Sequence, residues 1–319
     1  MRILFAGTPE IAVVPLESIN EKFDIVAILT APDKGRGRGR RVSFSPVKKR
    51  AIDLGLKILQ PKSLGDPDFL FQIKELKPEL LVVVAFGKIF RREFMDLFPM
   101  GGINMHPSLL PKYRGPAPIP AVILAGEKET GVTVQRLAME VDSGDILAVR
   151  KILLTGRETT ASLSYESSRI GAELLLSVIE RMERGEVWGV PQREDEATYC
   201  KKVKKEDGLI RWGKSAIEID RMVRAYFPWP NAYTYMGGEL LKILAGSVPD
   251  RKNLLETELS NTLPGTVLGT LENYGILVKT GKGVYCIEKL QLQYKKPNNW
   301  KAFLNGHPEV LESVLGGSK

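Results

Sequence analysis

Hydrophobic residues in the first 190 positions fall into short runs that alternate with longer amphipathic segments. The runs are RILFAG (residues 2–7), DIVAILTAP (24–32), LKILQ (56–60) and ELLVVVAFG (79–87), with helix-like stretches such as PVKKRAIDLG and DPDFLFQIKELK between them. This alternation predicts an α/β fold, a mostly parallel sheet with helices on both faces. The run LLVVVAFG is apolar throughout, which is typical of a central strand buried on both sides.

Two further patterns complete this first domain. Residues 132–154 predict two strands joined near a DSGD turn. Apolar side chains then recur at helical spacing over residues 161–186, at Leu163, Ile170, Leu174, Val178 and Met182. Glycine readily adopts the left-handed conformation that ends a helix, so we expect this one to end near Gly185.

The remaining pattern predicts a second domain. Residues 191–207 are polar and charged without apolar periodicity, which indicates a linker between domains at 1–190 and 208–319. Residues 215–226 predict an amphipathic helix, and the short apolar runs after it, separated by glycines, are typical of a small antiparallel barrel. We expect a barrel of the oligonucleotide-binding (OB) type, although periodicity does not separate it from other small barrels.

Composition narrows the class of protein. With 319 residues, 43% hydrophobic and 26% charged, the chain has the make-up of a two-domain globular protein. It has no run of roughly 18 apolar residues that could span a membrane, and MRILFAG is interpreted as a strand rather than a signal peptide, so we expect a cytoplasmic protein with no membrane partner. Two cysteines and two distant histidines give no spacing typical of a Cys/His metal site, so we expect no metal.

Positive charge is concentrated toward the end of the chain. Residues 1–200 carry 28 Lys+Arg against 26 Asp+Glu, a balance of +2, whereas residues 201–319 carry 18 against 12, or +6 of the total +8. A basic domain favours a polyanionic partner such as nucleic acid, although solubility alone also explains a mild excess.

Basic residues alternate with glycine near residue 38. They are Lys34, Arg36, Arg38, Arg40 and Arg41. Arginine suits contacts to phosphates and bases, so we interpret the segment as a nucleic-acid contact; the alternative is a solvated insertion. Lysines in the predicted linker would extend the same surface: Lys201, Lys202, Lys204 and Lys205.

Two other motifs are interpreted as structural. FAGTPE (5–10) lacks the glycine patterns of phosphate loops, so we expect Thr8 to cap a helix with Pro9 at its first position. We expect FPWPNAY (227–233) to pack between the helix and the barrel, whereas an exposed Trp229 would favour base stacking.

The segment GGINMHPSLLPKYRGPAPI (101–119) carries the first candidate chemistry. Asn104 and His106 are two residues apart at a predicted strand end, so they would share one face while Met105 points to the other. An amide and an imidazole can both donate hydrogen bonds to an oxyanion that forms on a carbonyl carbon. The alternative is a strand end with two satisfied polar residues.

A carboxylate in EVDSGDI would complete such a site. Asp142 is the candidate that could orient His106, stabilise its protonated form and accept a proton through water, and Asp145 is the competing choice. Either residue could instead act only as a turn former.

At this point INMHPSLLPKYRGPAPI and MEVDSGDIL together resemble the folate-dependent formyltransferase family. The family pattern is Asn-x-His followed by Ser-Leu-Leu-Pro and a later Asp-x-Gly turn, and the spacing from His106 to Asp142 (142 − 106 = 36 residues) agrees with it. FAGTPE, the basic insertion, SPVK, ETGVT, IRW and RAYFPWPNAY extend the resemblance over essentially the whole chain.

The resemblance implies a doubly wound, Rossmann-like catalytic domain and a C-terminal OB-like domain that binds tRNA. It implies formyl transfer from 10-formyltetrahydrofolate to methionine on initiator methionyl-tRNA, with Asn104, His106 and Asp142 catalytic. We expect a monomer. The folate site would be lined by Ser108, Leu109, Leu110, Pro111, Phe86, Gly87 and Ile89. Arg38 would reach the acceptor stem. The alternatives are a small amine as acceptor, or a non-catalytic RNA-binding protein.

Overall fold

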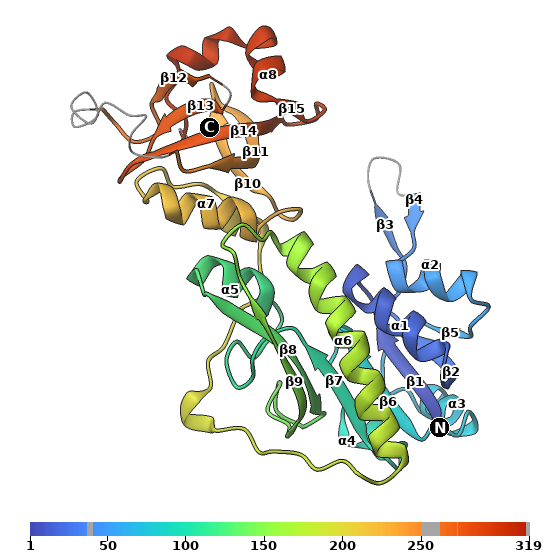
Figure 1. The fold of residues 1–319 in the computed structure, drawn as a ribbon. Helices are drawn as coiled ribbons and strands as arrows, with labels where there is room; N and C mark the ends of the chain where they lie inside the picture. Colours follow the sequence, from blue (N-terminus) through green and yellow to red (C-terminus); the bar gives the residue numbers. More distant parts are fainter. Residues whose placement is uncertain (37–40, 250–261, 273, 317–319) are drawn as a thin grey trace. The chain divides into compact units, whose positions relative to one another are not determined.

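The computed structural model describes residues 1–36, 41–249, 262–272 and 274–316, and the chain forms two compact units (Figure 1). The first contains residues 1–119, 128–154 and 162–202; the second contains residues 120–127, 155–161 and 203–319. The second unit thus resumes at residue 203, inside the segment predicted as a linker.

A seven-stranded sheet forms the centre of the first unit. Its strands are β1 (Arg2–Gly7), β2 (Asp24–Leu29), β5 (Ile58–Leu59), β6 (Leu80–Val84), β7 (Gly102–His106), β8 (Glu129–Arg136) and β9 (Ile146–Leu153). They lie in the order β5-β2-β1-β6-β7-β8-β9, and the first five are mutually parallel while β8 and β9 run antiparallel to their neighbours. The predicted mostly parallel sheet is confirmed. A separate hairpin pairs β3 (Lys34–Arg36) with β4 (Arg41–Ser43).

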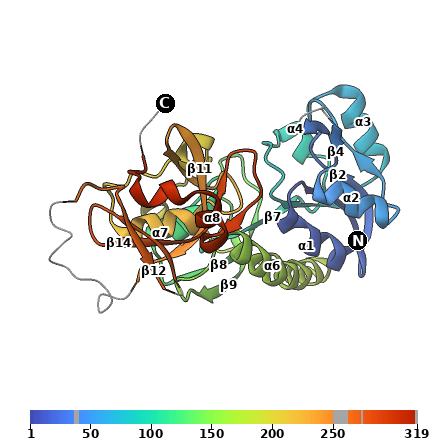
Figure 2. The ribbon, with the colours of Figure 1, turned by 90° about the horizontal axis from the view of Figure 1, so that it is seen from above.

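Helices cover both faces of this sheet. They are η1 (Glu10–Ala12), α1 (Val13–Asn20), α2 (Pro46–Asp53), α3 (Pro67–Glu75), α4 (Arg92–Met95) and α6 (Thr160–Glu183), whereas most of α5 (Pro118–Ala125) belongs to the second unit. Figure 2 shows α3 and α4 on one side of the strands and α1 and α6 on the other. On the α3/α4 side a row of stacked or tilted phenylalanines has ring centroids 5.2–6.2 Å apart.

The predicted helix cap at Thr8 is wrong. The chain leaves β1 through the short η1 turn, whose N-cap is Pro9, and the Thr8 hydroxyl accepts a hydrogen bond from the Ala31 N–H at 3.3 Å instead. The end of β1 lies beside the end of β2, so a polar group there can pair with an exposed backbone group of the neighbouring strand.

The second unit is an antiparallel sheet with helices. Its elements are η3 (Lys205–Gly208), α7 (Ala216–Ala225), β10 (Ala232–Met236), β11 (Glu239–Ser247), β12 (Val267–Leu271), β13 (Gly275–Lys279), β14 (Val284–Leu292), β15 (Asn298–Asn299), α8 (Trp300–Gly306) and η6 (Pro308–Glu312). The strand order is β10-β11-β14-β13-β12, with β15 on β14. This path through the described residues leaves β10 and β12 at opposite ends, so closure into a barrel stays a prediction.

The start of α7 follows its sequence pattern. Ser215 and Glu218 form a reciprocal capping box, in which the serine hydroxyl accepts from the Glu218 N–H at 3.3 Å and the carboxylate accepts from the Ser215 N–H at 3.0 Å. The hydrogen bonds that the carboxylate accepts from the Ser215 N–H, the Ser215 hydroxyl and the Lys214 ammonium lower the pKa of Glu218 to about 2.

Among the residues that the structure describes, we find no helix long and apolar enough to cross a membrane.

Close packing on the α6 side predicts that Gly171 does not tolerate a side chain. A Cβ at this position would lie 2.0 Å from the Met105 Sδ. We expect Gly171→Val to lower the free energy of unfolding by about 1–3 kcal/mol, the usual cost of overpacking a core, as measured by urea denaturation. Ser177→Val on the exposed side of α6 is the control, and equal losses in both variants would contradict this packing.

Candidate active site

Two polar side chains stand at the carboxyl end of β7. Asn104 and His106 are 9% and 4% exposed, while Met105 points to the opposite face, where it meets Gly171 of α6. The alternation predicted for this strand is confirmed. β7 pairs with β6, which lies beside β1 on the side away from β2, so the site adjoins the point where the strand order reverses. Open α/β sheets bind ligands there.

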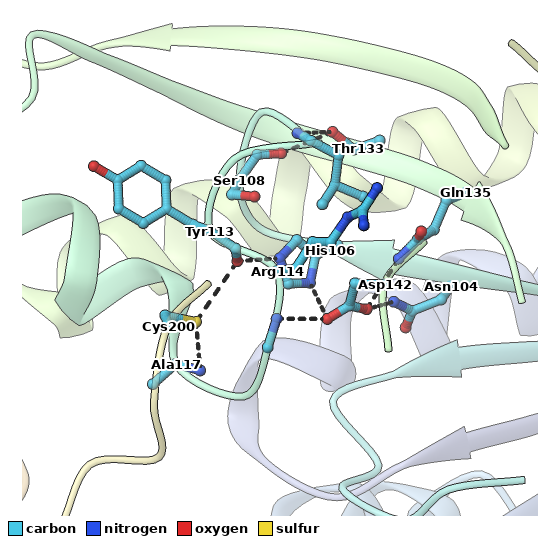
Figure 3. A network of polar contacts seen from close by, with 12 residues as sticks. Asn104, His106, Ser108, Tyr113, Arg114, Ala117, Thr133, Gln135, Asp142 and Cys200 are labelled. Atoms are coloured by element: carbon cyan, nitrogen blue, oxygen red, sulfur yellow. Dashed lines mark hydrogen bonds and ion pairs between the residues drawn. The ribbon is translucent and has the colours of Figure 1, made fainter. Parts of the chain in front are cut away.

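Asp142 lies in the turn between β8 and β9 and accepts hydrogen bonds from several elements. Its Oδ2 accepts from the Gly115 N–H at 2.8 Å, and its Oδ1 accepts from Gln135 Nε2 at 2.9 Å and Asn104 Nδ2 at 3.3 Å. Oδ2 also lies 3.5 Å from His106 Nδ1. Figure 3 shows the carboxylate between the imidazole and the two amides. The structure therefore brings the predicted amide, imidazole and carboxylate together.

The competing choice, Asp145, has a different environment. A Cβ added at Gly189 would lie 2.4 Å from the Asp145 Cβ, so the Asp145 side chain packs against the backbone of Gly189.

The contacts of His106 define where its protons lie. Nε2 is 2.9 Å from the Tyr113 carbonyl oxygen, and because a carbonyl only accepts, Nε2 carries the proton. Nδ1 faces Asp142 at 3.5 Å, longer than a normal hydrogen bond. The Nδ1 side and the second N–H of Asn104 are thus the edges that a substrate oxygen could approach. Hydrogen bonds of this kind are often loose before substrate binds.

The loop after β7 is held by its own polar groups. The Ser108 hydroxyl donates to the Lys112 carbonyl oxygen at 2.7 Å, and the Thr133 hydroxyl donates to the Ser108 carbonyl oxygen at 2.7 Å and accepts from the Leu110 N–H at 3.3 Å. Ser108 and Leu110 are buried. The Leu109 side chain lies against Gly131, where an added Cβ would clash with it. The loop is therefore fixed against β8.

Sequence comparison identifies the family. The formyl transferase profile matches residues 1–179, and the profile described as formyl transferase, C-terminal domain, matches residues 202–308. This chain belongs to the formyl transferase family.

Similar proteins include a named methionyl-tRNA formyltransferase and two proteins whose structures contain folates. A Treponema denticola protein named methionyl-tRNA formyltransferase is 43% identical over 320 residues, which is 98% of each chain. Two solved structures share the fold: HypX from Aquifex aeolicus with tetrahydrofolic acid (TM-score 0.66, 19% identity) and an N-formyltransferase from Helicobacter canadensis with folinic acid and dTDP-3-aminofucose (TM-score 0.63, 20% identity). The alignments cover 100% and 92% of this chain, and 49% and 99% of those chains; this chain thus spans about half of HypX.

The residues predicted to bind folate differ in exposure. The Phe86 ring is buried and stacks on Phe90 with centroids 5.5 Å apart, so its side chain serves the core. Gly87 is exposed with φ +78°, Ile89 is 71% exposed, and Pro111 is partly exposed. Because β6 and β7 are neighbouring parallel strands, the exposed residues after β6 adjoin the end of β7. Their part in folate binding stays a prediction.

The residues predicted to bind nucleic acid are only partly described. Arg38 and Arg40 lie outside the described residues, as do the side chains of Lys34, Arg36 and Arg41 on the β3–β4 hairpin. The linker lysines are all exposed: Lys201, Lys202, Lys204 and Lys205. Trp229 is 57% exposed, so the expectation that its segment serves only packing is wrong. In the described part of the chain, no group of three His, Cys, Asp or Glu could hold a metal ion.

Sequence reasoning missed several polar partners of the site. Gln135 and Thr133 share one face of β8, and they stand out as polar residues alternating with Val132 and Val134 in a buried strand. That alternation was a usable signal. Gln192 gave none, because it lies in a polar segment without periodicity.

The thiol beside the site should react slowly. Cys200 Sγ lies 3.4 Å from the Ala117 nitrogen, and burial, together with the charge of Asp142, raises the pKa of this thiol despite that hydrogen bond. In the second unit, burial raises the pKa of Cys286 to about 12. A raised pKa leaves less thiolate at a given pH.

We expect both thiols of the native protein to react with a disulfide reagent at pH 8 about tenfold or more slowly than glutathione, and both to react rapidly in urea. Fast modification of the native protein would contradict this environment.

Proposed function

We propose that this protein transfers the formyl group of 10-formyltetrahydrofolate to the amino group of methionine on initiator methionyl-tRNA. The Treponema denticola relative carries that enzyme's name and matches nearly the whole chain at 43% identity. The observation that supports catalysis most directly is the meeting of Asn104, His106 and Asp142, with the two contacts of the carboxylate at 3.3 and 3.5 Å. A protein that only binds RNA has no need of this buried polar group.

The chemistry needs one oxyanion and two proton movements. The neutral amine attacks the formyl carbon, a carbon–nitrogen bond forms, and negative charge develops on the formyl oxygen. Asn104 can donate to that oxygen through its second N–H, and His106 can donate through Nδ1 when both ring nitrogens carry a proton. The attacking nitrogen then loses a proton, which Asp142 can accept directly or through water. The bond between the formyl carbon and N10 of the folate breaks, and N10 gains a proton as it leaves.

A reduced folate is the donor that fits this edge of the sheet. Gly87 leaves its backbone exposed beside the site, and Ile89 offers an exposed apolar surface for a planar ring. Two proteins of the same fold have folates in their solved structures. The buried hydroxyl of Ser108 is already paired, so contacts from residues 108–111 come from backbone and apolar groups.

The charge distribution favours tRNA over a small amine. The Helicobacter canadensis enzyme of this fold has an aminosugar nucleotide in its structure, so the fold alone does not select the acceptor. Here residues 201–319 carry an excess of 18 − 12 = +6 charges, and the basic residues counted there include the exposed lysines at 201, 202, 204 and 205. A small acceptor would gain little from either feature. Cytoplasmic location and a monomeric state remain predictions that accompany this function.

Loss of the carboxylate or the ring should abolish turnover without weakening tRNA binding. We expect His106→Ala and Asp142→Ala to lower kcat by at least about a hundredfold, because each removes an interaction made in the transition state. Formylation of charged initiator tRNA measures kcat, and a filter-binding titration measures affinity. Near-normal turnover in either variant would exclude its catalytic role.

Exposed Trp229 predicts a stacking contact with an RNA base. Stacking of a base on an aromatic ring contributes about 1–3 kcal/mol, so we expect Trp229→Ala to raise the KM for tRNA about 5- to 100-fold while Trp229→Phe retains most affinity. Trp188→Ala, which removes an indole that is 76% exposed in the first unit, is the control. The rate of the tRNA reaction should also fall steeply as the salt concentration rises, whereas the rate of transfer to a free amine should not. Equal KM values for all variants would contradict the contact.

A further inference from the structure

The turn that carries Asp142 adopts a strained backbone. Asp142 has φ +53°, in the left-handed region, and a Cβ on Gly144 would lie 1.9 Å from the Arg136 carbonyl oxygen. A non-glycine residue in this region costs on the order of 1–3 kcal/mol unless its surroundings hold it there. The position of the carboxylate therefore depends on what binds the backbone of this turn.

Gln192 binds that backbone from a segment 50 residues further along the chain. Its Nε2 donates to the Asp142 carbonyl oxygen at 2.9 Å and to the Gly144 carbonyl oxygen at 2.7 Å. The same nitrogen lies 3.2 Å from Gln135 Oε1, and Gln135 in turn donates to the Asp142 carboxylate. Gln192 thus holds both ends of the turn and contacts the amide that binds its carboxylate.

Arg114 orients the Gln192 amide. Gln192 Oε1 accepts from Arg114 Nε at 3.0 Å and from Nη2 at 2.9 Å. A guanidinium only donates, so the amide oxygen must face it and the amide nitrogen must face the turn. Arg114 is fully buried, and its remaining donors bind both carboxylate oxygens of Glu194 at 2.7 and 2.9 Å and the Tyr199 hydroxyl at 3.3 Å. The hydrogen bond with Glu194 raises the pKa of Arg114, so the charge is retained.

The backbone around Arg114 also connects the two halves of the site. Tyr113 offers the carbonyl that accepts from His106, and Gly115 offers the N–H that donates to Asp142. Arg114 itself pairs with the same distant segment through its N–H to the Thr198 carbonyl and its carbonyl to the Cys200 N–H, both at 2.8 Å. A displacement of this segment would therefore move the imidazole and the carboxylate together.

We propose that Gln192, oriented by Arg114, is a positioning residue for formyl transfer that fixes the Asp142 turn by donating to its carbonyl oxygens. This inference rests on the proposed function. Gln192 acts through Asp142 and touches no substrate, so its loss should lower kcat and leave the KM values for the folate donor and tRNA unchanged.

The isosteric variant separates donation from packing. Gln192→Glu keeps the size of the side chain and can still accept from Arg114, but a carboxylate has no N–H for the turn. We expect both Gln192→Ala and Gln192→Glu to lower kcat about 10- to 100-fold, with both KM values within about twofold of wild type. Gln72→Ala, at an exposed glutamine of α3, is the control and should leave kcat unchanged.

A double-mutant cycle tests whether Gln192 acts through Asp142. In an Asp142→Asn background, Gln192→Ala should lower the single-turnover rate by a further factor of less than about three, because the effects of residues that act as a unit are not additive. Independent, multiplying losses would overturn the inference, as would wild-type kcat in Gln192→Glu or a change confined to KM. If Gln192→Ala does not fold, Gln192→Glu decides. If wild type does not formylate charged initiator tRNA, the proposed function fails instead, and that result is seen before any variant is compared.

Discussion

The site depends on one largely buried carboxylate that is held by donors from separate parts of the chain. The Asp142 side chain is 14% exposed, and it accepts from a strand amide, from a loop N–H and from a neighbouring strand. A carboxylate removed from water is costly unless it is hydrogen-bonded, so these donors are what make its position stable. They also define its direction, with one oxygen toward the amides and the other toward His106. Chemistry at the edge of the sheet follows from this arrangement.

The elements that could be predicted from sequence are those with a periodic apolar signal. The run that became β6 is buried at every position, and α6 buries four of the five residues that recur at helical spacing, while Ile170 is half-buried. The alternation in β7 correctly separated Met105 from Asn104 and His106, because strand geometry alone decides which face a side chain takes. Asp142 was identified by the family motif and its spacing from His106, because turn chemistry alone does not distinguish Asp142 from Asp145.

The contacts that sequence reasoning missed are polar and distant along the chain. Gln192 and Thr8 bind backbone groups of elements far away or in a neighbouring strand, and such pairing leaves no periodicity to detect. The full burial of Arg114 was also missed. Arginine is almost never fully buried without a partner, and no partner is near it in the sequence. Its partners lie 78–85 residues away, in a segment whose polarity indicated a linker. Exposure of Trp229 is likewise a tertiary property that composition does not reveal.

Rigid and strained elements contribute differently to this site. Asn104 and His106 stand on a central strand whose backbone is paired on both sides, so their positions follow from the sheet itself. Asp142 stands on a left-handed turn, which has no such support and would relax if it were released. The precision of the whole group is then limited by the turn and by the polar groups that bind its carbonyls. A misplacement of about 1 Å in a reacting group can cost about a hundredfold in rate, so hydrogen bonds one residue away from the chemistry can matter as much as those that make it.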